Sequence, residues 1–531
     1  MADLSPYNPT TGIYTSTRPQ ISLPQSPTTS IIDFLFRNLP AYSNRPALID
    51  PHSHQIITFS QLKQKISDLA HALHHIHNIS TGDVVLIFSP NSILFPVAFF
   101  AIASIGAIAT TANPVYTVNE LSHQINDSKP KLIITVDQIH SKVNGFNLPI
   151  VDLENCSDLI EKSRRQDAIS PSVSQDDVAA ILYSSGTTGL SKGVVLTHRA
   201  IIATALMVTA DQEFYGDGRS VFLCVVPLFH IMGLITFSYS QLQRGNAVVV
   251  MQRFELEKAL IAMEKYRVTH LYTAPPVVVA MAKQPAVVRR YDTSSLKQIG
   301  SGAAPLGKDV MDECSKVFPQ AKIIQGYGMT ETGGIISIEN TRVGSGRSGS
   351  SGALCPGMES KIIHIETLKP LPPNQLGEIW IRGPNLMQRY FHNKEATEQT
   401  IDKEGWLHTG DLGYFDDEGQ IYVVDRLKEL IKYKGYQVAP AELEGLLITH
   451  PRIMDAAVIP YPDEEAGEIP MAYVVRKAGS SVTGEEVQSF IAKQVAPFKR
   501  IHKVAFIDII PKAASGKILR RELRQKLQSK L

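Results

Sequence analysis

The sequence predicts an α/β protein with a large N-terminal part of several subdomains and a small α+β domain at the C-terminus. Its 531 residues exceed what one hydrophobic core usually contains, so at least two folding units are expected. Short apolar runs rich in β-branched residues alternate with helix-like segments over most of the chain. This alternation is typical of buried strands layered with helices. Around residues 423–444 it gives way to one compact α+β pattern followed by a basic helix.

Individual elements follow from where these runs begin and end. Strands are expected at residues 84–89, 131–136, 247–251 and 269–274, with a crossover helix over residues 256–268. We place a domain boundary between residues 427 and 428. It separates a large N-terminal domain (1–427) from a small C-terminal domain (428–531).

One uncharged stretch, residues 93–112, is long enough to span a membrane. Pro96 and Gly106 interrupt it, and alanine, serine and threonine dilute its hydropathy. A buried helix over about residues 92–105, followed by a core strand, explains these interruptions better than a membrane span does. We therefore expect no membrane span.

The composition excludes several classes of function. The 52 basic and 51 acidic residues leave a formal net charge of +1, which gives no overall attraction to nucleic acid or to an anionic membrane. The four cysteines are far apart and lack metal-ligand spacing, so reduced thiols in a non-secretory compartment are expected. The N-terminus has no basic region followed by an apolar run, as a secretory signal would have.

The chain ends in Ser529, Lys530 and Leu531. This S-K-L tripeptide is the address that the peroxisomal import receptor recognises at a free C-terminus. It follows a polar segment, which favours targeting over a chance tripeptide. The expected location is the peroxisome, with the import receptor as a partner.

A loop rich in hydroxyl groups and glycine, YSSGTTGLSKG, occupies residues 183–193. Glycines let a backbone approach an anion closely, serine and threonine hydroxyls donate to phosphate oxygens, and Lys192 adds charge. An expected strand precedes the loop and an expected helix begins near Thr197, which predicts a strand-to-helix turn. The spacing does not match the G-x-x-x-x-G-K-[ST] phosphate loop of kinases. A phosphate-binding loop of another kind is favoured over a flexible surface loop.

Two further motifs carry groups that suit a nucleotide. In QGYGMTETGG (residues 325–334), Tyr327 offers a face for adenine, Thr330 a hydroxyl and Glu331 a ligand for Mg²⁺. A tight turn with a capping threonine is an equally good interpretation of that motif alone. In HTGDLGYFDDEG (residues 408–419), Asp411 is expected in a turn, where its carboxylate can accept from both ribose hydroxyls. A simple Asx-turn is the local alternative.

Six motifs stand in order along the chain: YSSGTTGLSKGV, GYGMTE, GEIWIRGP, HTGDLGYFD, DRLKELIKYKGYQVAPAELE and PKAASGKILRREL. Together they closely resemble the AMP-forming acyl-CoA synthetases, in particular the plant 4-coumarate–CoA ligases and their peroxisomal ligase-like relatives. The resemblance covers residues 40–524. It implies mixed sheets flanked by helices and a small barrel-like sheet in the N-terminal part, and a mobile C-terminal domain.

The resemblance also implies a two-step reaction on a small carboxylic acid. The acid attacks the α-phosphorus of ATP to give acyl-AMP and pyrophosphate, and the thiol of CoA then displaces AMP. Such chemistry relies on positioning and on neutralising phosphate charge, so no nucleophile triad is expected. ATP, Mg²⁺ and CoA are the implied cofactor and co-substrates.

Carried over residue by residue, the resemblance assigns the following roles. The ATP phosphates would meet Ser184, Ser185, Gly186, Thr187, Thr188 and Lys192. AMP would be surrounded by Gln325, Gly326, Tyr327 and Thr330, the ribose held by Asp411 and Arg426, and Mg²⁺ bound by Glu331. Lys517 would act in the first step, and Lys428 would be the hinge of the C-terminal domain. Lys432 and Gln437 would act in the second step. CoA would be bound by Arg253, Lys434 and Gly435. His230 lies at the family's carboxylate gate, although a lone histidine in an apolar run is by default a core residue.

The expected acid pocket departs from the 4-coumarate–CoA ligases. Met232 replaces a tyrosine that meets the substrate hydroxyl, Thr236 replaces a nearby serine, and Gly334 stands in place of a proline. The pocket is otherwise small or apolar, with Ala303, Gly328, Gly333, Ile335 and Ile336. A buried phenol left unpaired costs about 1–3 kcal/mol. We therefore expect an apolar acid: a cinnamate without a free 4-hydroxyl, a medium- or long-chain fatty acid, or a cyclopentenone acid of the jasmonate route.

Three other functions share parts of this pattern. A beetle-luciferase-like oxygenase has the adenylation step and the same C-terminal tripeptide. A domain that loads a carrier protein is less favoured because no carrier domain follows. A nucleotide-binding regulator without catalysis is opposed by Lys517, Lys432, Glu331 and the complete phosphate loop.

Overall fold

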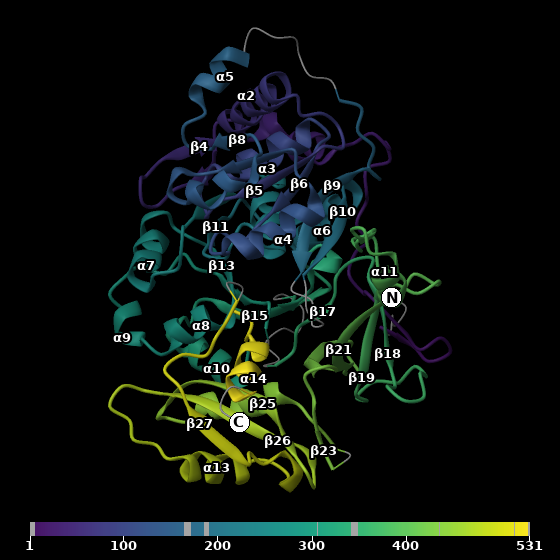
Figure 1. Ribbon diagram of the computed structural model, residues 1–531, viewed down its shortest axis with the longest axis vertical. Coiled ribbons are helices and arrows are strands. Elements are labelled where there is room, and N and C mark those ends of the chain that lie inside the picture. Colours follow the sequence, from purple (N-terminus) through teal and green to yellow (C-terminus); the bar gives the residue numbers. More distant parts are fainter. Residues whose placement is uncertain are drawn as a thin grey trace.

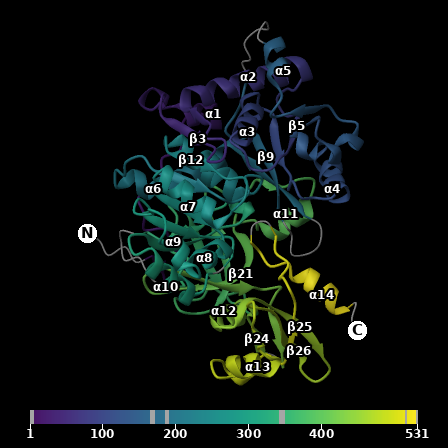
Figure 2. The same cartoon turned by 90° about the vertical axis from the view of Figure 1, so that its left-hand side faces the viewer.

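The computed structural model describes residues 6–163, 171–184, 191–304, 306–340, 349–434, 436–513 and 516–528. The described strands form four sheets, three in the N-terminal part and one at the C-terminus. Two perpendicular views place the C-terminal part as a separate body against one end of the rest (Figures 1 and 2). The mixed α/β architecture with a small C-terminal domain is the predicted one.

The first sheet has the order β20-β10-β9-β6-β5-β7-β8 among the described strands. Strands β9, β6, β5, β7 and β8 run parallel, and β10 and β20 are antiparallel additions at one edge. Their bounds are β5 Val84–Phe88, β6 Ile108–Thr111, β7 Leu132–Thr135, β8 Ile150–Asp152, β9 Val178–Ser184, β10 Lys192–Thr197 and β20 Arg389–Tyr390.

The second sheet has the order β17-β16-β15-β14-β13-β11-β12-β3-β4, and its central strands from β15 to β3 are parallel. Their bounds are β3 Pro46–Ile49, β4 Ile56–Thr58, β11 Val221–Cys224, β12 Ala247–Val250, β13 His270–Thr273, β14 Gln298–Ser301, β15 Lys322–Tyr327, β16 Ser337–Ile338 and β17 Ala353–Leu354. The strands predicted at residues 84–89, 131–136, 247–251 and 269–274 are confirmed in these two sheets.

The third sheet is antiparallel and occupies the place of the predicted small barrel-like sheet. Its order is β1 Tyr7–Asn8, β2 Ile13–Thr15, β18 Glu359–Ile363, β19 Gly377–Arg382, β21 Leu407–Phe415 and β22 Ile421–Arg426. The C-terminal sheet contains β23 Ile431–Tyr433, β24 Tyr436–Val438, β25 Ile453–Asp463, β26 Gly467–Arg476 and β27 Lys503–Phe506. Sheet membership thus changes between Arg426 and Ile431, and the division at 427/428 stays a prediction.

Helices cover these sheets. The α-helices are α1 Ile31–Phe36, α2 Phe59–His77, α3 Phe95–Ser104, α4 Val118–Ser128, α5 Ser157–Ser163, α6 His198–Phe214, α7 Leu256–Lys265, α8 Pro275–Ala282, α9 Pro285–Val288, α10 Lys308–Val317, α11 Lys394–Thr400, α12 Pro440–Thr449, α13 Gly484–Ala492 and α14 Arg520–Gln528. A π-helix spans Met232–Gln241, and 3₁₀ turns span Leu39–Ala41, Asp137–Lys142, Asn144–Phe146, Thr330–Thr332 and Pro497–Lys499.

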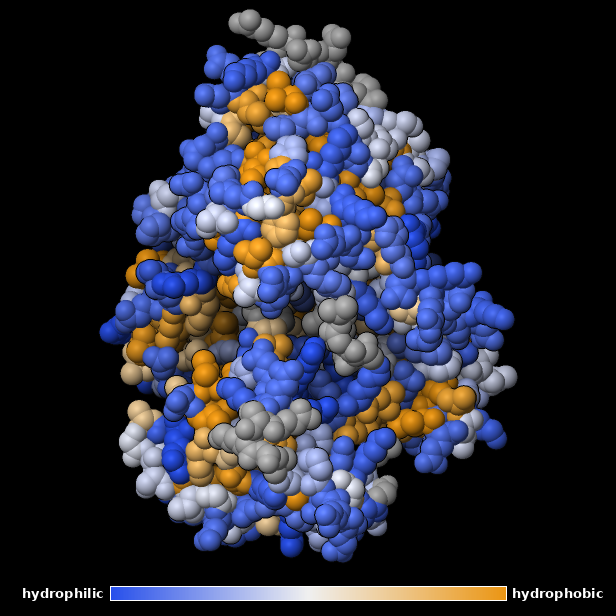
Figure 3. All heavy atoms as spheres, in the orientation of Figure 1, coloured by the Kyte–Doolittle hydropathy of each residue, from blue (hydrophilic) through white to orange (hydrophobic). Residues whose placement is uncertain are grey.

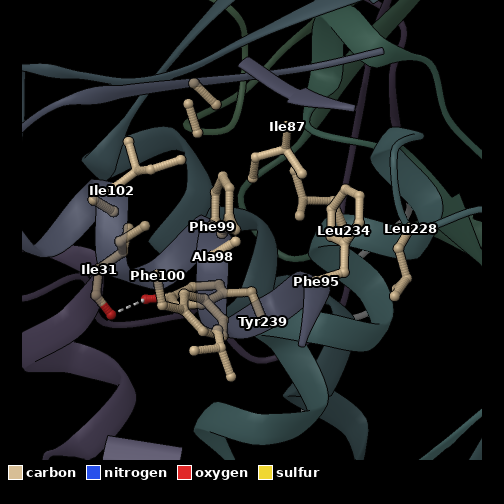
Figure 4. Packing of buried hydrophobic residues seen from close by; sticks show 14 of the residues in the cluster. Ile31, Ile87, Phe95, Ala98, Phe99, Phe100, Ile102, Leu228, Leu234 and Tyr239 are labelled. Atoms are coloured by element: carbon tan, nitrogen blue, oxygen red, sulfur yellow. Dashed lines mark hydrogen bonds between the residues drawn. The ribbon is translucent and has the colours of Figure 1, made fainter. Parts of the chain in front are cut away.

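The largest hydrophobic core packs around α3. Its residues from Phe95 to Ala103 are buried on every side, which is why the sequence there has no polar face. Phe99 and Phe100 pack beside Tyr239 of the π-helix, whose hydroxyl donates to the carbonyl oxygen of Ile31 at 3.1 Å (Figure 4). The predicted buried helix and following strand are confirmed. None of the helices within the described ranges is long and apolar enough to cross a membrane.

Two local predictions were wrong. The loop at residues 183–193 does not lead from a strand into a helix, because Val194, Val195 and Leu196 form β10, which pairs antiparallel with β9 before α6 begins. Asp411 does not lie in a turn, because it is inside β21 and opposite Arg426 of β22. In both places glycines and polar residues within the strand suggested a turn, and pairing with a partner strand overrode that local preference.

Replacing Phe99 tests the core. Phe99→Ala removes a fully buried ring and should lower the free energy of unfolding by about 3–5 kcal/mol. Phe214→Ala, at a side chain that is 62% exposed, should change it by less than about 0.5 kcal/mol. Urea titration followed by fluorescence compares the two variants, and equal midpoints would contradict this account of the core.

Candidate functional site

A cavity of about 770 Å³ lies where the three N-terminal sheets and the C-terminal part meet. Its walls include the carboxyl ends of β14 and β15, where parallel sheets usually bind ligands, and the ends of β21 and β22. The C-terminal part contributes Ala513 and Lys517. The space-filling view shows a hollow beside α7 and α8, bordered by apolar side chains, whose residues line a second, adjoining cavity (Figure 3). The volume of the first cavity is ample for a nucleotide and a small acid.

One corner of the cavity holds a fixed carboxylate. Asp411 accepts a hydrogen bond from the hydroxyl of Tyr327 at 2.7 Å and pairs with Nε of Arg426 at 3.3 Å. Burial raises the pKa of Asp411, and the positive charge of Arg426 opposes that rise. The cross-strand register of β21 and β22 sets the Asp411–Arg426 pair. A carboxylate held in this way is oriented to accept further donors from a ligand.

A second corner gathers around Glu331. Ser184 Oγ donates to Glu331 Oε1 at 3.1 Å, and the hydroxyl of Tyr390 donates to the same oxygen at 2.8 Å. Lys192 is the cross-strand partner of Ser184, and its Nζ lies 4.8 Å from the centre of the Tyr390 ring. Thr330 lies in the wall beside Glu331. Ser185, Gly186, Thr187 and Thr188, predicted to contact phosphate here, lie outside the described residues.

Lys517 reaches the cavity from the C-terminal part. Burial, followed by the nearby charge of Arg426, lowers the pKa of Lys517 to about 8. The preceding Gly516 has φ of +85°, and a Cβ there would lie 3.0 Å from Cβ of Ala274 and 3.3 Å from Cδ of Pro276. A glycine therefore lets the loop approach the start of α8. Leu427 and Lys428 also line this side of the cavity.

An apolar arm extends from the same cavity. Met232 and Thr236 of the π-helix line it, together with Ile231, Gly302, Ala303, Gly326, Gly328, Gly334 and Ile335. Tyr272 lies over Gly300, where a Cβ would come within 2.7 Å of its ring, and the Tyr272 hydroxyl accepts from Nε2 of Gln298 at 3.1 Å. The contacts with Gly300 and Gln298 thus fix the ring of Tyr272, which forms a wall of the arm.

Several predicted residues are not brought to this cavity. Gln325 is buried on the opposite side of β15, where its Oε1 accepts from the backbone N–H of Leu306 at 2.8 Å. Ile336 is fully buried in the core of the third sheet, and Gly333 packs against Thr204. Alternation of side chains along β15 explains why Gln325 points away while Ile324 and Gly326 line the cavity.

Among the residues predicted for the second step and for CoA, Lys432, Lys434 and Arg253 also lie elsewhere. Lys432 is exposed on β23, and Lys434 is exposed and pairs with Glu465. Gln437 belongs to β24, with its side chain outside the described part, and Gly435 lies outside the described residues. Arg253 is exposed and pairs with Glu255 at 2.8 Å.

Arg253 lines a second cavity of about 1290 Å³. Its other basic groups are His52, His54, His230, Lys258, Lys265 and Lys512, and its acidic groups are Asp50, Glu154 and Glu255. His230, Met232, Ala303 and Ala513 line both cavities, so the two adjoin there. Burial lowers the pKa of His230 to about 4, which keeps its ring neutral near pH 7. His230 therefore lies at the boundary between the cavities and not in a closed core.

The donor set fits Mg²⁺ held together with phosphate. Among the residues that the structure describes, no three His, Cys, Asp or Glu side chains gather to hold a metal ion alone. Mg²⁺ is usually bound by one or two carboxylates plus substrate phosphates. Glu331, inside the cavity and hydrogen-bonded to Ser184, offers such a carboxylate.

Sequence reasoning missed Tyr390 and Tyr272. Tyr390 belongs to a two-residue strand outside every motif, and only the pairing of β20 with β10 brings it to Glu331. Tyr272 was placed in a strand, but nothing in a single sequence shows which face of that strand meets the cavity. The small residue opposite it, Gly300, becomes informative only once the register of β13 and β14 is known.

Comparisons with known proteins agree with this arrangement. The AMP-binding enzyme family model matches residues 35–391, and the model of the AMP-binding enzyme C-terminal domain matches residues 442–517. The chain is 47% identical to a probable CoA ligase, CCL5, of Humulus lupulus (99% of this chain, 98% of the relative). It is 46% identical to peroxisomal OPC-8:0-CoA ligase 1 of Arabidopsis thaliana (96% and 95%). Other relatives, at 42–44% identity, are named 4-coumarate–CoA ligases or ligase-like proteins.

Among solved structures, ATP-bound MatB from Rhodopseudomonas palustris superposes with a TM-score of 0.85 at 26% identity, covering 94% of this chain and 99% of MatB. Both family models match in the order in which the two parts of the fold occur. The chain therefore belongs to the AMP-binding enzyme family, within the group of AMP-forming acid–CoA ligases that resemble the 4-coumarate–CoA ligases.

Proposed function

We propose that this protein is an ATP-dependent ligase that joins a hydrophobic carboxylic acid to CoA through an acyl-adenylate. One observation carries the proposal. A single cavity combines the Asp411–Arg426 corner, the Glu331–Ser184–Lys192 corner, the ammonium of Lys517 and an apolar arm. The Asp411–Arg426 corner suits a ribose, the Glu331–Ser184–Lys192 corner suits a polyphosphate, and the arm suits an apolar acid.

In the first step, the acid's carboxylate attacks the α-phosphorus of ATP and pyrophosphate leaves. Lys517 donates to the charge that develops between carboxylate and phosphate. Ser184, Lys192 and the loop residues Ser185, Gly186, Thr187 and Thr188 hold the outer phosphates. Tyr327, Gly326 and Thr330 surround the AMP moiety. Bound Mg²⁺ neutralises phosphate charge, and Glu331 is the residue that would hold it.

In the second step, the thiol of CoA attacks the acyl carbonyl and AMP leaves. The second cavity, with Arg253 among its basic groups, is the proposed path for CoA, and neutral His230 stands where the two cavities adjoin. Lys432, Lys434, Gly435 and Gln437 would face the site after the domain 428–531 turns about Lys428. The arrangement described here, with Lys517 inside the cavity and Lys432 exposed, suits the first step.

An apolar acid is supported by the lining of the arm. Met232 offers only a weak acceptor to a phenol, and Thr236 is largely buried. A relative named as an OPC-8:0-CoA ligase adds support for a fatty or cyclopentenone acid, and a cinnamate without a 4-hydroxyl remains within the proposal. We further propose peroxisomal import through Ser529-Lys530-Leu531, which lie outside the described residues. The same relative is named peroxisomal.

The proposal is tested by incubating the protein with ATP, Mg²⁺ and CoA over a panel of 4-coumarate, cinnamate, methoxylated cinnamates, fatty acids and cyclopentenone acids. Formation of an acyl-CoA, identified by mass, supports the ligase. Light emission with luciferin would support the oxygenase instead. ATP binding without any pyrophosphate release would support the regulator. A strong preference for 4-coumarate would remove the apolar-acid proposal and leave the ligase intact.

Lys517→Ala should slow acyl-adenylate formation by roughly 10²–10³-fold, because it removes a donor aimed at transition-state charge. Conversion of supplied acyl-adenylate and CoA to thioester should change far less. Lys432→Ala is the matched control, since it removes an exposed lysine of the same domain and should affect mainly the second half-reaction. Single-turnover assays of each half separate the two, and an equal loss in both halves for Lys517→Ala would contradict its role.

The first step should depend on pH through Lys517. The lowered pKa means that the ammonium is lost as pH rises through about 8, so kcat/KM for adenylation should fall above that pH. Lys517→Arg keeps a positive charge at every accessible pH and should remove this alkaline decline, even if its rate is lower. A wild-type profile that stays flat to pH 10 would contradict the expectation.

Tyr272→Ala should lengthen the apolar arm and shift preference toward longer acids. One methylene in an apolar pocket changes selectivity by about 10–200-fold, so the optimum among straight-chain acids should move by two or more carbons. Phe237→Leu is the control, because Phe237 packs near Tyr272 without lining the cavity. Comparison of kcat/KM over acids of increasing length checks this. An unchanged optimum would show that Tyr272 does not limit the arm.

A further inference from the structure

Tyr390 lines the cavity although it belongs to a two-residue strand outside the sequence motifs. Its side chain is only 6% exposed and still reaches the cavity. The hydroxyl donates to Glu331, and the ring faces the ammonium of Lys192. We propose that Tyr390 is a positioning residue for metal-bound ATP, which orients the Glu331 carboxylate for a divalent cation and limits where Lys192 can move. The inference rests on the proposed function.

Two donors converge on one oxygen of Glu331. Ser184 and Tyr390 both donate to Oε1, at 3.1 and 2.8 Å. Within the described ranges, no residue donates to Oε2. A carboxylate held on one side in this way presents its other oxygen in a fixed direction. Partners that orient a metal's carboxylate ligand commonly control how tightly the ion binds.

The backbone around Tyr390 ties it to both sides of this corner. The N–H of Met387 donates to the carbonyl oxygen of Glu331 at 2.8 Å, and the N–H of Phe391 donates to that of Gly193 at 2.7 Å. Val194 is the cross-strand partner of Tyr390. The short segment from Met387 to Phe391 therefore connects the strand of Lys192 with the turn of Glu331.

The ring of Tyr390 lies beside the ammonium of Lys192. Nζ of Lys192 lies 4.8 Å from the ring centre, within range of a cation–π contact. A lysine on a flexible four-carbon stem loses entropy when it binds phosphate. An aromatic face beside it reduces the positions available before ATP arrives.

Tyr390→Phe keeps the ring and removes only the donor. We expect the Mg²⁺ concentration that gives half-maximal ATP binding to rise about 10–100-fold, with binding of metal-free ATP unchanged. Titration calorimetry of ATP over a range of Mg²⁺ concentrations, without the acid, measures both, and Mn²⁺ resonance in the presence of ATP gives a second readout. Tyr414→Phe, at a tyrosine of the third sheet outside the cavity lining, is the matched control.

A second variant shows whether Tyr390 acts through Glu331. In a Glu331→Gln background, Tyr390→Phe should cause no further change in metal dependence. Tyr390→Leu, which also removes the ring, should additionally weaken metal-free ATP binding through Lys192. Near-ultraviolet circular dichroism confirms that each variant is folded.

The outcomes separate this inference from the function on which it rests. A wild-type protein that binds ATP without any dependence on a divalent cation would overturn the inference, whereas ATP binding without any pyrophosphate release would overturn the proposed function. A wild-type protein that shows metal dependence, with Tyr390→Phe indistinguishable from it, would overturn the inference alone. So would an equal effect of Tyr390→Phe in the wild-type and Glu331→Gln backgrounds.

Discussion

The close contact between Gly516 and the start of α8 brings Lys517 of the C-terminal part into the cavity. Gly516 has no side chain, so the loop lies against Ala274 and Pro276 and places Lys517 in the cavity wall near Arg426. The base of that loop is fixed by Arg520. It makes two bonds of 2.7 Å to the buried carboxylate of Glu444, contacts Glu429 and donates to the carbonyl oxygen of Val458 at 3.2 Å. Lys517 is thus three residues from a rigid anchor and next to a tight contact.

Burial strengthens the electrostatic interactions between the charged groups of the site. Asp411 and Glu331 are buried and Lys517 is half-buried, and an interaction between buried charges is screened less than in water. The same burial raises the pKa of Asp411 and lowers that of Lys517, which shows that each charge is costly until a ligand or a partner compensates it. Arg426 pairs with Asp411 and also opposes the charge of Lys517. A nucleotide's phosphates would relieve that repulsion.

Much of the fold could be predicted because buried strands leave a plain pattern. The runs at residues 84–89, 131–136, 247–251 and 269–274 are short, apolar and flanked by helices, and each became a strand. Strand β10 was missed because Lys192 and Gly193 were assigned to the preceding loop, which hid the apolar residues after them. Asp411 was placed in a turn because the glycines beside it favour turns, whereas pairing with β22 keeps the segment extended.

The motifs predicted which segments contribute to the site, but not which of their side chains line the cavity. Ordered motifs pointed to Ser184, Lys192, Glu331, Asp411, Arg426 and Lys517, which all line one cavity. They could not tell Gly326 from Gln325, because neighbours along an extended strand face opposite ways. Tyr390 and Tyr272 depend on strand pairing between distant segments. Such pairing leaves no signal in a single sequence.

The central claim is that this cavity activates an acid with ATP before any thiol takes part. Exchange of labelled pyrophosphate into ATP measures that step directly, because it requires reversible acyl-adenylate formation and nothing further. We predict exchange that depends on a suitable acid and on Mg²⁺ and proceeds with CoA absent. Thioester formation from the same acid without any such exchange, or exchange that begins only when CoA is added, would contradict the account.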